Sequence, residues 1–121
     1  MMQIFKKFTF EAAHHLAANV EAGHPYSRLH GHSFSAEIYF SGNPDKKTGW
    51  VIDFALIEQH IEDIKKDLDH GYLNDLEGLS NPTLENIAIW IWERLYKVST
   101  KVSKVVVMRG SCGEGCIYEG P

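Results

Sequence analysis

The sequence predicts an α+β domain with the element order β-β-α-α-β-β, in which two helices cover one face of an antiparallel sheet. Strand-forming residues occupy positions 3–10 and 29–41, apolar residues repeat with helical spacing in the middle of the chain, and strand-forming residues return near its end. The chain has 121 residues, 44% of them hydrophobic, with no repeat or linker. We therefore expect a single domain, residues 1–121, with its own core.

The first two elements are expected to be strands. Residues 3–10 mix aromatic, β-branched and basic side chains, with Phe8 and Phe10 on one side. Residues 29–41 are rich in strand formers, and their apolar members share one face: Phe34, Ala36, Ile38 and Phe40. A turn at residues 42–45 ends this strand, and a short strand is expected at residues 50–52.

Two helices are expected next, each with a capping residue. Asp53 is placed to cap the first, whose apolar residues repeat at spacings of four, three and four: Ile57, Ile61, Ile64 and Leu68. Residues 70–82 contain glycine, asparagine and proline and predict a loop. Thr83 can cap the second helix, whose apolar face comprises Ile87, Trp90, Ile91, Trp92 and Leu95. Strands are then expected at residues 104–108 and 116–118.

Composition excludes several classes of partner. Twelve basic and sixteen acidic residues give a net charge of −4, which does not suit a nucleic-acid backbone. The apolar run at residues 87–92 is far shorter than the roughly 20 residues of a membrane-spanning helix, and residues 1–7 lack the apolar stretch of a signal peptide. We expect a cytoplasmic protein that binds neither nucleic acid nor membrane, with free thiols at Cys112 and Cys116.

Self-association is also expected. Two helices cover only one face of a short sheet, and the sheet edges stay open to pairing. The sequence therefore favours a homo-oligomer.

Seven histidines stand out, and two share a strand face. His30 and His32 lie two positions apart in a predicted strand, so both imidazoles emerge on the same side. A third ligand can come from His14 or His15, but adjacent strand residues face opposite ways, so only one of them can join. Three histidines leave one tetrahedral zinc position open, as in catalytic sites. The alternative is that these are ordinary surface histidines.

Asp69 and His70 follow the first helix directly. A carboxylate can orient an imidazole that moves protons near neutral pH. Equally, His70 can simply complement the negative end of the helix dipole. The residues alone leave both interpretations open.

Several separated blocks resemble the 6-pyruvoyltetrahydropterin synthase family, closest to its bacterial 6-carboxytetrahydropterin synthase branch of the queuosine pathway. The resemblance extends over nearly the whole chain, in order and with similar spacing. It rests on Phe8-Thr9-Phe10-Glu11-Ala12-Ala13-His14, Arg28-Leu29-His30-Gly31-His32-Ser33-Phe34, Thr48-Gly49-Trp50-Val51-Ile52-Asp53-Phe54, Leu68-Asp69-His70-Gly71-Tyr72-Leu73-Asn74-Asp75, Asn81-Pro82-Thr83 and Gly115-Cys116-Ile117-Tyr118.

This resemblance implies a tunnelling fold (T-fold) whose subunits form trimers and hexamers. It selects His14 over His15 and implies that His14, His30 and His32 bind Zn²⁺. It also implies a small-molecule pterin substrate, 7,8-dihydroneopterin triphosphate, with Asp69 and His70 as a proton relay. Candidate cations for the phosphates are Arg28, Lys46 and Lys47.

The chain departs from the family pattern in two places. Tyr26 stands where the family has a cysteine base, so either Tyr26 is activated, or His70 takes over, or the usual reaction is slow or replaced. Gly110 stands where the family has the glutamate that holds the pterin. Ser111 takes the place of a threonine, and Glu114 can accept the pterin N–H groups or can be an ordinary loop residue.

Three functions follow from this resemblance. The first is a zinc-dependent lyase of the 6-carboxytetrahydropterin synthase type, which eliminates triphosphate and remodels the pterin side chain. The second is an aldolase-like enzyme that cleaves the side chain. The third is a divergent relative that keeps the zinc and pterin sites without the usual turnover.

Overall fold

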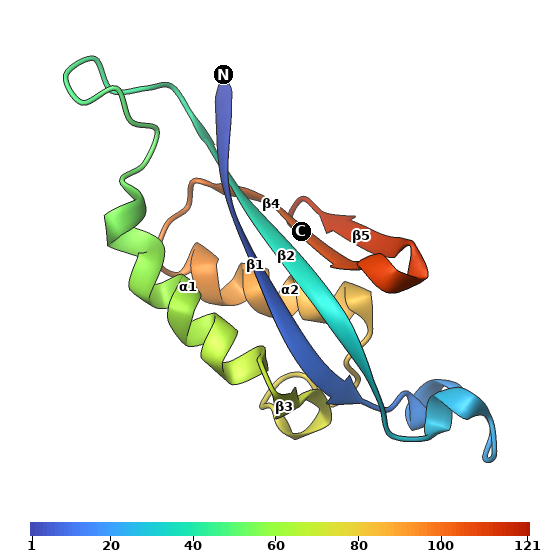
Figure 1. Ribbon diagram of the computed structural model, residues 1–121. Coiled ribbons are helices and arrows are strands. Elements are labelled where there is room, and N and C mark those ends of the chain that lie inside the picture. The colour runs from blue at the N-terminus through green and yellow to red at the C-terminus, as the bar shows by residue number, and fades with distance from the viewer.

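The computed structural model describes residues 1–121 and shows a single sheet with two helices (Figure 1). The strands and helices are, in chain order, β1 (Met2–His14), β2 (His30–Gly42), α1 (Phe54–Leu68), β3 (Gly71–Tyr72), α2 (Leu84–Tyr96), β4 (Val102–Arg109) and β5 (Glu114–Tyr118). This order confirms the predicted β-β-α-α-β-β pattern and adds one short strand, β3, between the helices.

The sheet has the strand order β3-β1-β2-β4-β5. The four longer strands pair antiparallel, as predicted, and β1 pairs with β2 along its whole length, from Met2 opposite Gly42 to His14 opposite His30. The two-residue β3 lies parallel to β1 and pairs only with Ala12 and Ala13. Most of the outer edge of β1 is therefore left without a neighbouring strand.

The core lies between the two helices and one face of the sheet. Even-numbered residues of β1 and β2, among them Phe10, Phe34 and Ile38, are buried against the apolar faces of α1 and α2. Both helices thus pack on the same sheet face (Figure 1). Neither helix combines the length and apolar character that a membrane crossing requires.

The predicted caps are present at both helices. The Asp53 carboxylate accepts the Ala55 N–H at 2.9 Å, and the Thr83 hydroxyl accepts the Asn86 N–H at 3.1 Å. The strand expected at residues 50–52 is wrong, because this segment pairs with no other strand. Its one buried side chain is Val51, whose carbonyl accepts the Lys101 ammonium at 2.6 Å.

The predicted histidine ligands lie at the end of the sheet where β1 ends and β2 begins. The connection between them, residues 15–29, folds into two short 3-10 turns at Ala17–Asn19 and Pro25–Ser27. The β4–β5 turn approaches this end from the other side of β2. Residues distant in sequence therefore meet there.

Candidate metal centre and substrate cavities

Three imidazoles converge where the core face of the sheet reaches its end. His14 continues the buried even-numbered positions of β1, and His30 and His32 continue those of β2. The ring centroids of His14 lie 4.5 Å from His30 and 5.1 Å from His32, and those of His30 and His32 are 4.9 Å apart. One ligand nitrogen from each ring lies within 4.8 Å of the others.

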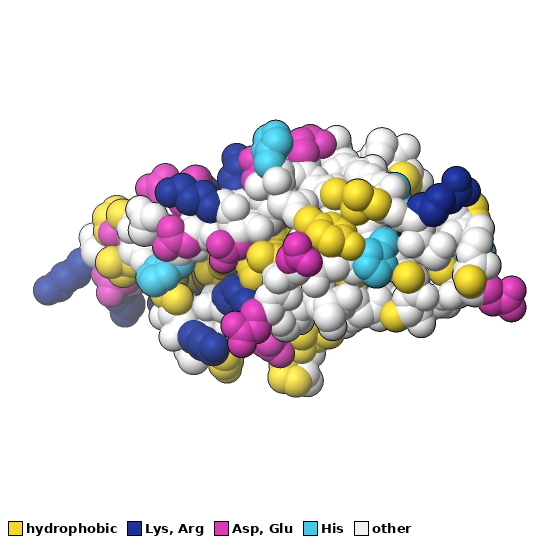
Figure 2. All heavy atoms as spheres, turned by 90° about the horizontal axis from the view of Figure 1, so that it is seen from below, with side chains coloured by type: hydrophobic (Ala, Val, Ile, Leu, Met, Phe, Trp, Pro, Cys, Tyr) yellow, Lys and Arg dark blue, Asp and Glu magenta, His cyan; other side chains and the backbone are white.

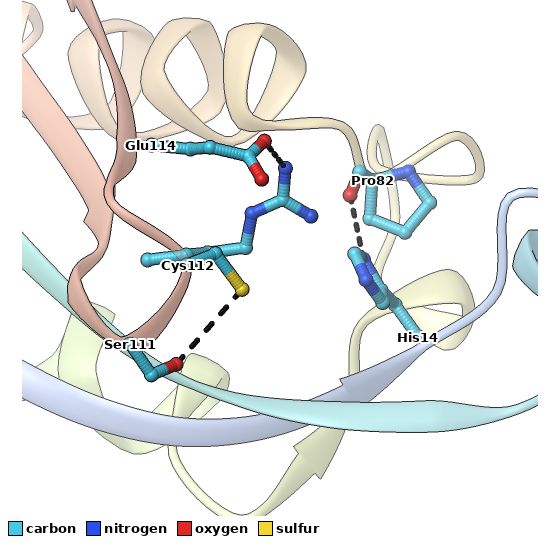
Figure 3. A network of polar contacts seen from close by, with 6 residues as sticks. His14, Pro82, Ser111, Cys112 and Glu114 are labelled. Atoms are coloured by element: carbon cyan, nitrogen blue, oxygen red, sulfur yellow. Dashed lines mark hydrogen bonds and ion pairs between the residues drawn. The ribbon is translucent and has the colours of Figure 1, made fainter.

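Backbone carbonyls fix the orientation of two of these rings. The Nδ1–H of His14 donates to the Pro82 carbonyl at 2.9 Å, and that of His30 donates to the Arg28 carbonyl at 2.8 Å. Figure 3 shows the His14 ring held by Pro82. Because each Nδ1 carries the proton, the lone pair of each Nε2 is free to bind a metal.

The three imidazole rings fit a divalent metal ion that prefers nitrogen ligands. His14 is 1% exposed, and its Nε2 and that of His32 are buried without any hydrogen-bond partner. Burial lowers the pKa of His14 to about 4, and burial together with the positive charge of Arg109 lowers the pKa of His32. Neutral imidazoles with unused lone pairs are the form that a metal requires.

His15 does not join the cluster. Its ring lies 6.0 Å from that of Tyr72, and its Nδ1 accepts the Ala17 N–H at 3.2 Å. The strand alternation thus separates the two neighbouring histidines, as the sequence predicts.

The side chains of Asp69 and His70 are in contact just before β3. The Asp69 carboxylate lies 3.0 Å from Nδ1 of His70, whose side chain is 80% exposed. The backbone of Glu11 holds both residues, because its N–H donates to Asp69 at 2.8 Å and its carbonyl accepts the His70 N–H at 2.5 Å. The Glu11 N–H also lowers the pKa of Asp69, which keeps this carboxylate ionised.

His70 has a left-handed backbone, with φ of 56°. This conformation is unusual for a residue with a side chain, and such strain is typical of functional positions. The hydrogen bond to Glu11 and the contact with Asp69 hold His70 in place. The pair therefore has a defined geometry in spite of its exposure.

An open hollow of about 550 Å³ is bordered both by His70 and by His32 of the histidine cluster. Its wall includes His32, His70 and Ser111, together with Glu11 and Ser33. Ser111, in the turn after β4, is thus brought to the same hollow as His70. Asp69 is not among the residues that line it.

A second cavity, of about 360 Å³, shares His32 with the open hollow, and we call it the Tyr26 cavity. Its polar lining consists of Tyr26, His30, His32, Arg109, Cys112 and Glu114. The Tyr26 ring is 6.4 Å from that of His30 and 55% of the residue is exposed. Tyr26 and Glu114, distant in sequence, therefore meet beside the cluster.

Two residues of the site were missed by the sequence analysis. Glu11 binds Asp69 and His70 through its backbone, and its carboxylate accepts the Ser33 hydroxyl at 2.6 Å. Arg109 donates to the Glu114 carboxylate at 2.9 Å, the ion pair that Figure 3 draws at Glu114. A signal for Arg109 was present, since Val105, Val107 and Arg109 alternate onto the core face of β4.

The two cysteines are free thiols, as expected. Cys112 lies near Ser111, with 3.9 Å between Sγ and Oγ, whereas Cys116 packs against the core and donates to the Leu84 carbonyl.

On the face seen in Figure 2, basic side chains are interspersed with acidic ones and do not gather in one patch.

Comparison with known proteins gives one family. The sequence model of 6-pyruvoyl tetrahydropterin synthase matches residues 3–121. A 6-carboxy-5,6,7,8-tetrahydropterin synthase of Synechocystis sp. is 37% identical, with 100% of this chain and 95% of that protein covered. A dihydroneopterin monophosphate aldolase of Pyrococcus furiosus is 40% identical over 78% of this chain and 75% of that protein.

Solved structures show the same fold. The 6-pyruvoyl tetrahydropterin synthase of Caenorhabditis elegans superposes with a TM-score of 0.85 at 24% identity, covering 99% of this chain and 96% of that one. This agreement confirms the predicted tunnelling fold of the subunit.

Proposed function

Because this chain belongs to the 6-pyruvoyl tetrahydropterin synthase family, we propose that it is a zinc-dependent lyase acting on 7,8-dihydroneopterin triphosphate. The reaction is of the 6-carboxytetrahydropterin synthase type, in which triphosphate leaves and the pterin side chain is remodelled. The observation that carries the proposal is the cluster of three imidazoles with free Nε2 lone pairs beside a hollow that also contains His70.

His14, His30 and His32 are the proposed zinc ligands, with the Pro82 and Arg28 carbonyls as their supports. Zinc in such a site, with one position open, polarises substrate oxygens and stabilises negative charge that develops on them. Burial lowers the pKa of His14 and of His32, which keeps both rings in the neutral form that binds a metal.

Asp69 and His70 are the proposed proton relay. The Asp69 carboxylate is next to Nδ1 of His70, which leaves Nε2 of the imidazole to take a proton from a side-chain carbon of the substrate. The electron pair released from that C–H bond expels the triphosphate from the neighbouring carbon. Ser111, in the wall of the same hollow, is a proposed substrate contact.

Tyr26 is the third proposed catalytic residue, and Glu114 a second proposed substrate contact, both in the Tyr26 cavity. A phenol has a hydroxyl proton that it can donate. Tyr26 is therefore suited to return a proton while His70 removes one.

A second candidate is the side-chain-cleaving reaction of an aldolase. The similarity to the dihydroneopterin monophosphate aldolase and the tyrosine at position 26 favour it. The same relay would then take a proton from a side-chain hydroxyl, and a carbon–carbon bond would break in place of the bond to the phosphate.

The test uses zinc-loaded protein with dihydroneopterin triphosphate and dihydroneopterin monophosphate. We expect triphosphate release from the first, with the pterin product identified by mass spectrometry. A hydroxymethylpterin product from either compound would favour the aldolase. His30→Ala should lower zinc content and abolish turnover, and an unchanged zinc stoichiometry would contradict the ligand assignment.

Substitutions at Tyr26 separate an active enzyme from a divergent binder. If the phenol takes part in proton transfer, Tyr26→Phe lowers kcat about 100-fold while zinc content stays constant. A large gain of activity in Tyr26→Cys, from a wild-type protein without turnover, would identify the chain as a pterin-binding relative whose site has lost its base.

A further inference from the structure

Arg109 brings a positive charge to the histidine cluster from the end of β4. Its side chain is only 17% exposed, and it lines the Tyr26 cavity together with His30 and His32.

The guanidinium has hydrogen-bonding capacity that the chain itself does not use. It donates from one terminal nitrogen to the Glu114 carboxylate at 2.9 Å, while its Nε is buried with no partner. A buried N–H without an acceptor costs free energy, and an arginine has five donors in a planar fork that fits two oxygens of one anion. The unpartnered Nε thus marks a place where an acceptor is missing.

We propose that Arg109 binds the phosphate carried by the pterin side chain, in the Tyr26 cavity, and that Glu114 is the counterion which the phosphate displaces or shares. This inference rests on the proposed function, and it holds for a monophosphate as well as a triphosphate. The guanidinium would hold two phosphate oxygens in the bidentate arrangement that arginine favours.

The other candidate cations are less well placed within one chain. Lys46 and Lys47 follow β2, whose 13 residues separate them from His30 by about 40 Å. Arg28 is exposed, and its contact with the cluster is through its carbonyl, which holds His30. Arg109 alone of these four lines a cavity together with two of the clustered histidines.

The assignment gives Glu114 a role different from accepting pterin N–H groups. The amino-pyrimidine edge and the side-chain phosphate are at opposite ends of the substrate, whereas Arg109 and Glu114 are in contact. A single ion pair cannot hold both ends. A purely structural role is the remaining alternative, because Arg109 and Glu114 are directly opposite each other across β4 and β5.

The experiment compares neopterin 3′-monophosphate with uncharged neopterin as ligands of zinc-loaded protein, measured by titration of pterin fluorescence. The wild type should bind the phosphate ester about ten- to a hundredfold more tightly. In Arg109→Gln this ratio should fall to about one, with neopterin affinity and zinc content unchanged. Arg109→Lys should keep part of the preference, and Lys104→Gln, on the same strand, should keep all of it.

A phosphate preference that survives Arg109→Gln would overturn the proposal. So would an equal loss of neopterin and ester affinity, which is the result expected of a structural ion pair. If Arg109→Gln does not fold, Arg109→Lys decides: it should lower the ratio of ester to neopterin affinity while neopterin affinity stays unchanged, and an unchanged ratio would overturn our assignment. Phosphate-selective binding that depends on Arg109 in a protein without turnover would refute the proposed function alone.

Discussion

His14 is the residue at which burial and chemistry are most closely linked. In the folded, metal-free protein its pKa falls to about 4 because the ring is buried, whereas in the unfolded chain it titrates near 6.5. Between these values the unfolded state binds a proton that the folded state does not. The free energy of unfolding must therefore decrease as pH falls from about 6.5 to 4.

We predict that the free energy of unfolding falls by about 3 kcal/mol over this pH interval because of His14. Each pH unit between the two pKa values contributes about 1.36 kcal/mol. His14→Gln has no group that titrates there. In chelator-treated samples, urea unfolding of wild type and variant at pH 7 and pH 4 should show the smaller loss in the variant. Parallel pH profiles would show that His14 is not held neutral by burial.

Alternation along strands explains which site residues could be predicted. His30 and His32 share a face because they are two apart, and His14 shares it because Phe8, Phe10 and Ala12 precede it with the same parity. The same rule applied to β4 would have found Arg109. Glu11 could not be found in this way, because it acts on Asp69 and His70 through backbone groups.

At the level of elements, the start of α2 is coupled to the metal site. Thr83 caps the helix, and the carbonyl of the residue before it, Pro82, holds His14. Loss of the cap allows the first turn to fray, and fraying moves the carbonyl that orients a proposed ligand. The helix end thus affects both the stability of α2 and the orientation of the proposed ligand His14.

We predict that Thr83→Ala lowers the free energy of unfolding of the metal-free protein by about 1 kcal/mol and also weakens zinc affinity. Asp53→Ala is the matched control, since it removes the same kind of cap from α1, beside Met2 and Ile4 at the opposite end of β1. It should cost similar stability without changing zinc affinity. Chemical unfolding and competition with a zinc chelator measure the two effects, and equal zinc affinities in the two variants would contradict the coupling.

The sequence predicts well those elements in which a periodic apolar pattern extends over many residues. Helical spacing and caps located α1 and α2, and alternation located β1 and β2. The strand prediction for residues 50–52 failed because three strand-forming residues carry no information about a partner strand. In the structure no strand pairs with this segment. β3 could not be predicted, since its two residues gain strand geometry only by lying beside Ala12 and Ala13.

At the scale of the whole molecule, the sheet has open edges and exposed apolar residues. β3 covers only two residues of the outer edge of β1, and β5 is an edge strand with no neighbour beyond it. Ile117 on β5 is 63% exposed, and Phe5 on β1 is 54% exposed. Exposed edges with apolar side chains favour pairing between chains, which supports our expectation of a homo-oligomeric trimer or hexamer.

We predict that the purified protein sediments as such an oligomer and that Ile117→Glu weakens the assembly. Burying one isoleucine contributes about 1.5–3 kcal/mol, so its replacement by a charge should raise the dissociation constant at each contact roughly ten- to a hundredfold. Glu62→Lys, on the exposed side of α1, is the control and should leave assembly unchanged. Analytical ultracentrifugation over a concentration series distinguishes the variants, and a wild type that remains monomeric at high concentration would refute the prediction. If the variant dissociates while its zinc content stays at the wild-type level, the histidine cluster is complete within one chain. Any loss of turnover that accompanies dissociation then measures what neighbouring chains add to the open hollow.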